Sequence, residues 1–156
     1  MKNYAVESCT VSDLNASELA HCLRLVVDGG AVNAKTTARD FPKSSMIALA
    51  RNNGEVVGVA SIKPIRENYT KGIARKAKFI FDPKTPELGY VVIELAHRGH
   101  QISSRMAAAL AKGSGGLFAT TSDPKMKSAL RSAGFQQRGC EWKGRRGDLI
   151  SLWLKE

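Results

Sequence analysis

A turn with the right residues to bind an anion lies in the second half of the chain. Residues 97–101 (His-Arg-Gly-His-Gln) join the apolar, β-branched run 88–93 to residues 102–110, which are rich in Ala, Leu and Met. The first segment predicts a buried strand and the second a helix. A helix that begins at this turn directs unpaired N–H groups and the positive end of its dipole into it. The residues therefore predict a site for a phosphate-like anion.

The residues that could bind a metal or form disulfides are sparse. His97 and His100 flank an arginine, and the sequence offers no evident third ligand, so we expect no metal site. Cys9, Cys22 and Cys140 are odd in number and widely spaced, which is typical of reduced thiols. Since the first residues also contain no apolar signal core, we expect a cytoplasmic location.

The turn and its helix resemble the acetyl-coenzyme A signature of the GNAT family of N-acetyltransferases. That signature is a strand followed by Arg/Gln-x-x-Gly-x-Gly/Ala at the start of a helix. Residues 98–103 (Arg-Gly-His-Gln-Ile-Ser) occupy it here, with Gln101 in place of the middle Gly and Ser103 in place of the final small residue. Residues 119–135 are similar to the family's strand, Asn-centred turn and helix ending in Gly-Phe. Because Gly normally lets the backbone approach the pyrophosphate, we expect Gln101 to weaken binding without abolishing it.

The resemblance implies acetyl-CoA as the cofactor and names the residues that would bind it. The pyrophosphate would lie on backbone N–H groups at the start of the helix, and the pantetheine arm would run beside exposed backbone of the strand. Arg98, His100 and Arg105 would supply positive charge. The implied cofactor-binding residues are Val92, Ile93, Leu95, Arg98, Gly99, His100, Gln101, Ile102, Ser103, Ser104, Arg105 and Asp123.

Acetyl transfer requires a neutral amine, and an alkyl amine with a pKa of about 10.4 is mostly protonated at neutral pH. A carboxylate would take that proton, directly or through water. Glu87 matches the head of the strand, where several family members place this base. It could equally be a strand-end carboxylate that pairs with a lysine. Glu94 is a weaker candidate.

The group that would protonate the leaving thiolate is not fixed by the sequence. The family often uses a Tyr on the helix that ends in Gly-Phe, and the matching position here is Leu130. Water, Tyr90 or Cys140 could substitute, and we include Tyr90 with Glu87 as the candidate catalytic residues. Asp123 stands where the family usually has Asn. These departures also fit a domain that has kept the fold and lost or changed its chemistry.

The expected elements form one acyl-CoA N-acyltransferase-like domain over residues 1–156. Asn52-Asn53-Gly54 predicts a tight hairpin, because Asn and Gly tolerate positive φ. The basic stretch 64–84 has no clear pattern, although 79–81 could be a short strand or an apolar anchor. Strands are predicted over 4–11, 46–51, 56–62, 88–93, 117–121, 135–142 and 149–154, and helices over 14–27, 33–41, 102–110 and 124–133. The resemblance implies an α/β (α+β) fold with a mixed, mostly antiparallel sheet, splayed fourth and fifth strands and flanking helices.

The net charge of +10 is confined to two stretches. Residues 63–84 carry seven basic and two acidic side chains, and residues 125–146 carry seven and one. Both could be solvated surface, or they could attract a polyanion. If they flank the acceptor side, the amine acceptor would be anionic or part of a nucleic acid or protein, and a polycation would be repelled. Few aromatic residues accompany the charges, so base stacking is unproven.

Three functional classes follow from these observations. The first is an acetyl-CoA-dependent N-acetyltransferase. The second is a diverged member of the family that binds or modifies nucleic acid through its basic face without ordinary acetyl transfer. The third is an interaction module with no ligand. A second copy of the chain is a candidate partner. No apolar run approaches the roughly 18 residues of a membrane span, so we expect no membrane partner.

Overall fold

Residues 4–93 contain a four-stranded antiparallel sheet in the computed structural model, which describes residues 3–29 and 33–156. The strands lie in the order β1-β2-β3-β4. The β2–β3 hairpin is the predicted one, with Asn53 at φ 52° and Gly54 at φ 81°, the left-handed pair that a two-residue turn needs. The strands are β1 (Tyr4–Cys9), β2 (Met46–Asn52), β3 (Glu55–Ile62) and β4 (Leu88–Ile93).

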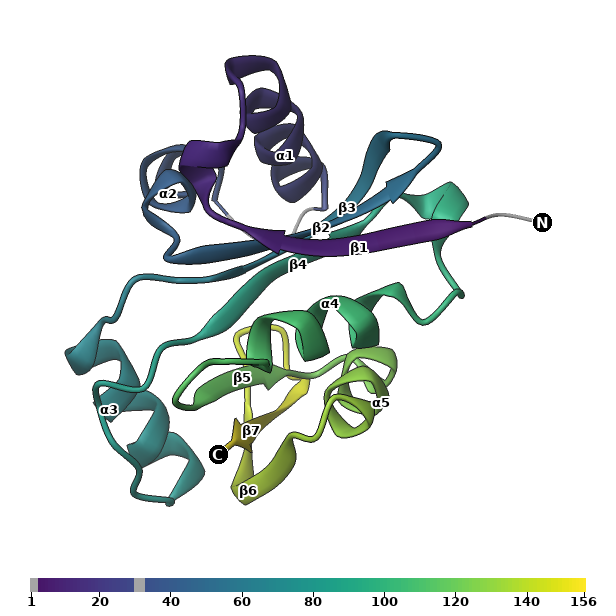
Figure 1. Ribbon diagram of the computed structural model, residues 1–156. Helices are drawn as coiled ribbons and strands as arrows, with labels where there is room; N and C mark the ends of the chain where they lie inside the picture. The colour runs from purple at the N-terminus through teal and green to yellow at the C-terminus, as the bar shows by residue number, and fades with distance from the viewer. Residues whose placement is uncertain (1–2, 30–32) are drawn as a thin grey trace.

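A second, three-stranded antiparallel sheet has the order β5-β7-β6. Its strands are β5 (Leu117–Thr121), β6 (Gln136–Lys143) and β7 (Leu149–Lys155). One parallel bridge, between Glu87 and Phe118, connects the two sheets, and β4 and β5 then separate (Figure 1). The splayed fourth and fifth strands implied by the family resemblance are thus present.

Helices cover both sheets (Figure 1). Helices α1 and α2 pack on one face of the first sheet, and α4 lies on its other face, between the two sheets. Helix α5 packs beside α4 in the same layer. The helices are α1 (Ala16–Asp28), α2 (Ala34–Asp40), α3 (Glu67–Ala77), α4 (Ile102–Ala111) and α5 (Pro124–Ser132), with short 3-10 turns at Val11–Asp13, Phe41–Lys43 and Leu95–His97.

Helix α1 begins two residues later than the sequence predicts. Asn15, rather than Ser12 or Asp13, is its N-cap, and the Asn15 side chain accepts a hydrogen bond from the Glu18 amide at 2.8 Å. The Glu18 carboxylate accepts one from the Asn15 amide at 3.2 Å, which completes a capping box. Such a cap satisfies two amides that the helix itself leaves unpaired.

Helix α3 is the main element that the sequence does not predict. It lies in the stretch 64–84, where Thr70, Ile73 and Ala77 are buried at helical spacing. Ile73 and Ala77 pack on Phe118 of β5 and on β7 residues, so α3 covers the face of the second sheet opposite α4 and α5. Residues 79–81 form no strand; Phe79 and Phe81 pack into this same cluster as apolar anchors.

Candidate active site

The loop before α4 combines residues at positive φ with backbone N–H groups that have no intrahelical acceptor, which are features of a phosphate site. Gly99 has φ 89° and Gln101 has φ 59°, so two residues of the short loop hold positive φ before the helix starts. The first backbone bond into α4 is donated by the Arg105 amide to the Gln101 carbonyl at 3.1 Å. The amides of Ile102, Ser103 and the residue after them therefore have no intrahelical acceptor. A Cβ at Gly99 would meet nothing within 4 Å, so the loop surface is open there.

Several side chains that were expected near the phosphates are held by neighbouring groups. The Arg98 guanidinium donates from Nε to the Ile93 carbonyl at 3.1 Å. The Arg105 guanidinium donates from Nη2 to the Tyr4 carbonyl at 3.1 Å, which connects α4 to β1. His100 is exposed and its ring lies 5.1 Å from that of Tyr4. Arg98 and His100 thus stay at the open surface of the loop, while Arg105 also holds β1.

The three residues predicted to lie beside the pantetheine arm differ in where their backbone points. The Glu94 amide donates to the Val57 carbonyl of β3 at 2.8 Å. Because polar groups alternate along an antiparallel strand, those of Val92 also face β3, whereas those of Ile93 face the side on which β4 and β5 separate. Leu95 lies beyond the strand in a 3-10 turn and is 79% exposed. Within β4, the backbone groups of Ile93 are therefore the ones that face away from β3, and the Ile93 carbonyl accepts the bond from Arg98.

The carboxylate of Glu87 lies at the head of β4, beside the bridge to β5, and the residue is only 8% exposed. Its Oε1 accepts a hydrogen bond from Arg66 Nη2 at 3.1 Å and lies 3.4 Å from Lys63 Nζ. Its Oε2 accepts a long hydrogen bond from the Tyr69 hydroxyl at 3.5 Å. Two cations and a phenol therefore converge on one buried carboxylate. The pairing with a lysine that the sequence left open is present, and Arg66 joins it.

Tyr90 lies on the same side of the sheet, at a bulge in β4. Its φ of 52° is unusual for a residue other than glycine, and the β3–β4 register shifts at this point. Lys63 Nζ lies 4.4 Å from the centre of the Tyr90 ring, so this lysine contacts both Glu87 and Tyr90. Burial, followed by the negative charge of Asp40, raises the pKa of Tyr90 above its ordinary value. Its hydroxyl therefore stays protonated at neutral pH.

Tyr69 of α3 is the second phenol of this cluster. Burial first, and then the charge of Glu87, raise the pKa of Tyr69 to about 12. The Arg66 guanidinium lies 4.0 Å from the centre of its ring, a cation–π contact that holds both side chains near Glu87. Sequence reasoning missed Lys63, Arg66 and Tyr69; the only signal was the excess of positive charge over residues 63–84.

Asp123 and Leu130, at the two other positions compared with the family, both have contacts that stabilise the fold. Asp123 is the N-cap of α5, and its Oδ1 accepts a hydrogen bond from the Lys125 amide at 3.0 Å. Leu130 is fully buried between α5, α4 and the second sheet. Leu130 therefore cannot supply the proton that a Tyr at this position would donate to the leaving thiolate.

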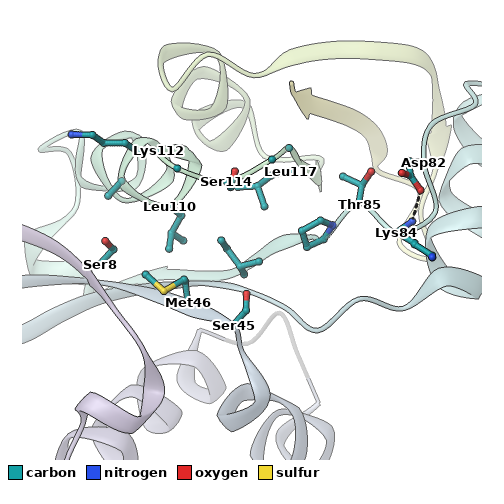
Figure 2. A pocket seen from close by; sticks show the side chains of 16 residues that line it. Ser8, Ser45, Met46, Asp82, Lys84, Thr85, Leu110, Lys112, Ser114 and Leu117 are labelled. Carbon is teal, nitrogen blue, oxygen red and sulfur yellow. Dashed lines mark hydrogen bonds between the residues drawn. The ribbon is translucent and has the colours of Figure 1, made fainter.

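A cavity of about 580 Å³ lies near the other end of α4 (Figure 2). Its lining includes Ser8 of β1, Met46 of β2, Leu110 of α4 and Ser114 of the following loop. The N-terminal loop of α4 is not part of this lining. The feature of the loop that points to an anion is therefore its set of backbone N–H groups without an intrahelical acceptor.

Comparison with known proteins places the chain in a family. Residues 18–130 match the acetyltransferase (GNAT) family, and this span is most of the chain. The chain therefore belongs to the GNAT family of acetyltransferases, acyltransferases that use acetyl-CoA. The match confirms the resemblance carried by the turn at residues 98–103. No curated protein sequence matches the chain.

Solved structures agree on the fold. A GNAT acetyltransferase from Streptococcus agalactiae superposes with a TM-score of 0.69 at 13% identity, covering 97% of this chain and 96% of that one. A ribosomal-protein-alanine N-acetyltransferase from Brucella melitensis gives 0.64 at 19% identity, with 97% and 98% covered. RimL, a ribosomal L7/L12 alpha-N-protein acetyltransferase in complex with coenzyme A, gives 0.61 at 12% identity, with 97% and 93% covered. Within the described residues, no helix is long and apolar enough to cross a membrane.

Proposed function

We propose that this protein transfers an acetyl group from acetyl-CoA to the amine of an anionic acceptor, on a protein or a nucleic acid. The observation that carries the proposal is the pair of left-handed residues, Gly99 and Gln101, at the start of α4 in a chain of this family. A left-handed Gln is an uncommon conformation that costs about 1–2 kcal/mol. Its presence here supports a loop shaped to present backbone N–H groups to phosphate.

The residues around the loop fit acetyl-CoA. The amides from Gly99 to Ser103 would hold the pyrophosphate, whereas the Arg98 amide donates to the Leu95 carbonyl at 3.4 Å. The side chains of Arg98 and His100 would add positive charge from the exposed surface. The outward backbone of Ile93 would pair with the pantetheine amides, once Arg98 releases the Ile93 carbonyl. Ser104 and Arg105 belong to the first turn of the helix, and Asp123 would approach the cofactor from α5. When bound, acetyl-CoA supplies the acetyl group as an activated thioester.

Glu87 and Tyr90 are the residues we propose for proton transfer. As the amine nitrogen forms its new bond to the acetyl carbon, it loses a proton, which Glu87 accepts directly or through water. The departing sulfur requires a proton, for which Tyr90 is the candidate donor, because its raised pKa keeps its hydroxyl protonated. Lys63 lies between the two side chains and would stabilise negative charge that develops there. Cys140 lies exposed on β6, apart from the contacts of this cluster.

The charges near Glu87 support an anionic acceptor. Lys63 and Arg66 share one carboxylate, and Arg66 is half exposed, so positive charge remains available to a ligand. Two of the structural relatives act on ribosomal proteins according to their names, which favours a protein acceptor. The three free cysteines support a cytoplasmic location. The second candidate function, nucleic-acid binding without ordinary acetyl transfer, is supported by the charge of residues 125–146 and by the family Tyr being Leu130.

Calorimetric titration of the purified protein with acetyl-CoA tests the proposal. Dephospho-CoA and ATP are the controls, because they separate recognition of the whole cofactor from generic attraction to phosphate. Saturable binding that prefers acetyl-CoA supports the transferase and justifies a screen of amine acceptors. No binding at millimolar acetyl-CoA would contradict it and would favour the nucleic-acid function, which titration with single-stranded and double-stranded RNA and DNA then tests.

A further inference from the structure

An apolar groove lies at the C-terminal end of α3. Its volume is about 590 Å³, and it is formed by the last turns of α3 and the segment that follows. We call it the α3 groove; it is lined by Lys71, Ala74, Arg75, Lys78, Phe79, Ile80, Phe81 and Pro83. None of these residues belongs to the site proposed for acetyl transfer.

The groove is held in shape by buried neighbours. Lys78 ends α3 in a left-handed conformation, and the Phe79 amide donates to the Ala74 carbonyl at 3.1 Å. The Phe81 ring packs edge-on against Phe118 of β5 at 5.3 Å. Because Phe79 and Phe81 face the second sheet, the residue between them points away, and Ile80 is 95% exposed. The exposed isoleucine is therefore fixed by its two anchored neighbours.

The charged side chains that line the groove are all positive. Lys71, Arg75 and Lys78 line it, and the two acidic residues of the stretch, Glu67 and Asp82, do not. Within residues 3–29 and 33–156, no ion pair involves any of these three cations. An apolar floor with unpaired cations at its rim is complementary to a segment that combines carboxylates with a bulky apolar side chain.

We propose that the α3 groove docks an acidic segment of a partner protein, which inserts an apolar side chain beside Ile80. A nucleic acid is less well matched, because the side chain that protrudes from the groove, Ile80, is aliphatic and offers no ring for base stacking. Phe79 and Phe81 are half-buried and pack into the cluster on the second sheet. A lipid surface is also less well matched, since a concave wall with one protruding isoleucine lacks the broad apolar face that membrane-binding helices present.

Fluorescence anisotropy with synthetic peptides tests the proposal on the full chain without acetyl-CoA. The probe is a labelled, glutamate-rich peptide with a central Leu-Phe pair, and its counterpart carries Ala-Ala instead. We expect the Leu-Phe peptide to bind at least about tenfold more tightly, which is the effect of burying one bulky side chain. Ile80→Asp should remove this preference, and Lys71→Glu combined with Arg75→Glu should weaken both peptides and reduce the salt dependence of binding.

Matched controls separate the groove from general charge and from unfolding. Leu149→Asp changes a different exposed apolar residue, and Arg145→Glu with Arg146→Glu makes the same change of charge in the β6–β7 turn. Both should leave the Leu-Phe preference intact, and all variants should melt as the parent does. Equal affinity for the two peptides would overturn the proposal. So would tighter, Ile80-dependent binding of single-stranded RNA or of anionic phosphatidylserine vesicles. None of these binding and melting measurements requires acetyl transfer. Failure of the docking proposal is therefore distinguishable from failure of the proposed function.

Discussion

At the scale of single residues, the central question is what Glu87 does. The carboxylate is almost buried and is shared by Lys63 and Arg66, which is the arrangement of a structural ion pair. It also lies where β4 and β5 begin to separate, which is where the family resemblance puts the base. A structural ion pair and a base respond differently to loss of the charge, so a single substitution distinguishes them.

Glu87→Gln should lower kcat by about a hundredfold or more while leaving the acetyl-CoA Kd unchanged, if the carboxylate takes the proton. The matched control is Glu94→Gln, which removes the weaker candidate and should leave kcat near that of the parent. An unchanged kcat for Glu87→Gln, together with a lower Tm, would instead make Glu87 a structural partner of the two cations.

Tyr69 gives a prediction about stability at high pH. Its pKa is about 12 in the folded protein, against 10.0 ordinarily, because of burial and the charge of Glu87. A raised pKa means that the unfolded chain loses this proton first, so the stabilisation is complete below pH 10 and is lost as pH rises from 10 through about 12. Urea unfolding at several pH values in this range should show a steeper loss for the parent than for Tyr69→Phe. Identical slopes would contradict the assignment.

At the scale of elements, the loop before α4 depends on a conformation that its sequence resists. Gln101 holds φ 59°, where Gly would be at no steric cost. Two features offset the cost: α4 is anchored by buried Ile102 and Met106, and Arg105 ties it to β1. The loop should therefore tolerate Gly and reject a β-branched residue.

Gln101→Gly should retain the fold and bind acetyl-CoA more tightly, because it removes a side chain next to the proposed pyrophosphate site. Gln101→Val should lower the free energy of unfolding by about 1 kcal/mol or more and weaken acetyl-CoA binding, since β-branched residues resist positive φ. Thermal melts and calorimetric titration of both variants measure the two effects. If Val is accepted without loss of either stability or affinity, the conformation of residue 101 is not what shapes the loop.

Local signals explain which elements the sequence predicts. The Asn53-Gly54 hairpin and the strand–turn–helix around Gly99 follow from residue types a few positions apart, and the structure contains both. Helix α3 has Arg66 as an N-cap without a side-chain hydrogen bond, and it contains Gly72. Its buried residues pack on the distant Phe118, so its own sequence carries little helical signal. The residues around Glu87 were missed for the same reason, because Arg66 and Tyr69 reach it only through α3.

At the scale of the whole molecule, α3 connects two regions with different proposed roles. Its first turn and N-cap bring Tyr69 and Arg66 to Glu87, and its last turns form the α3 groove. The 11 residues of α3 rise about 16 Å, a distance that about five residues of extended chain span. A protein acceptor held in the groove could therefore place an amine about five residues away beside Glu87. This geometry joins the docking proposal to the proposed function.

A peptide acceptor that carries an acidic, apolar anchor about five residues from its amine should be acetylated with a lower KM than the same peptide without the anchor, at similar kcat. The groove contributes equally to binding the substrate and the transition state, and uniform binding of this kind changes KM alone. Ile80→Asp should accordingly raise KM for the anchored peptide to that of the plain one and leave kcat unchanged, whereas Glu87→Gln should lower kcat with both. Steady-state kinetics of the parent and the two variants with each of the two peptides tests this division between docking and chemistry. If Ile80→Asp lowers kcat with the plain peptide as well, the groove and the Glu87 cluster do not act separately, and α3 contributes to the chemical step itself.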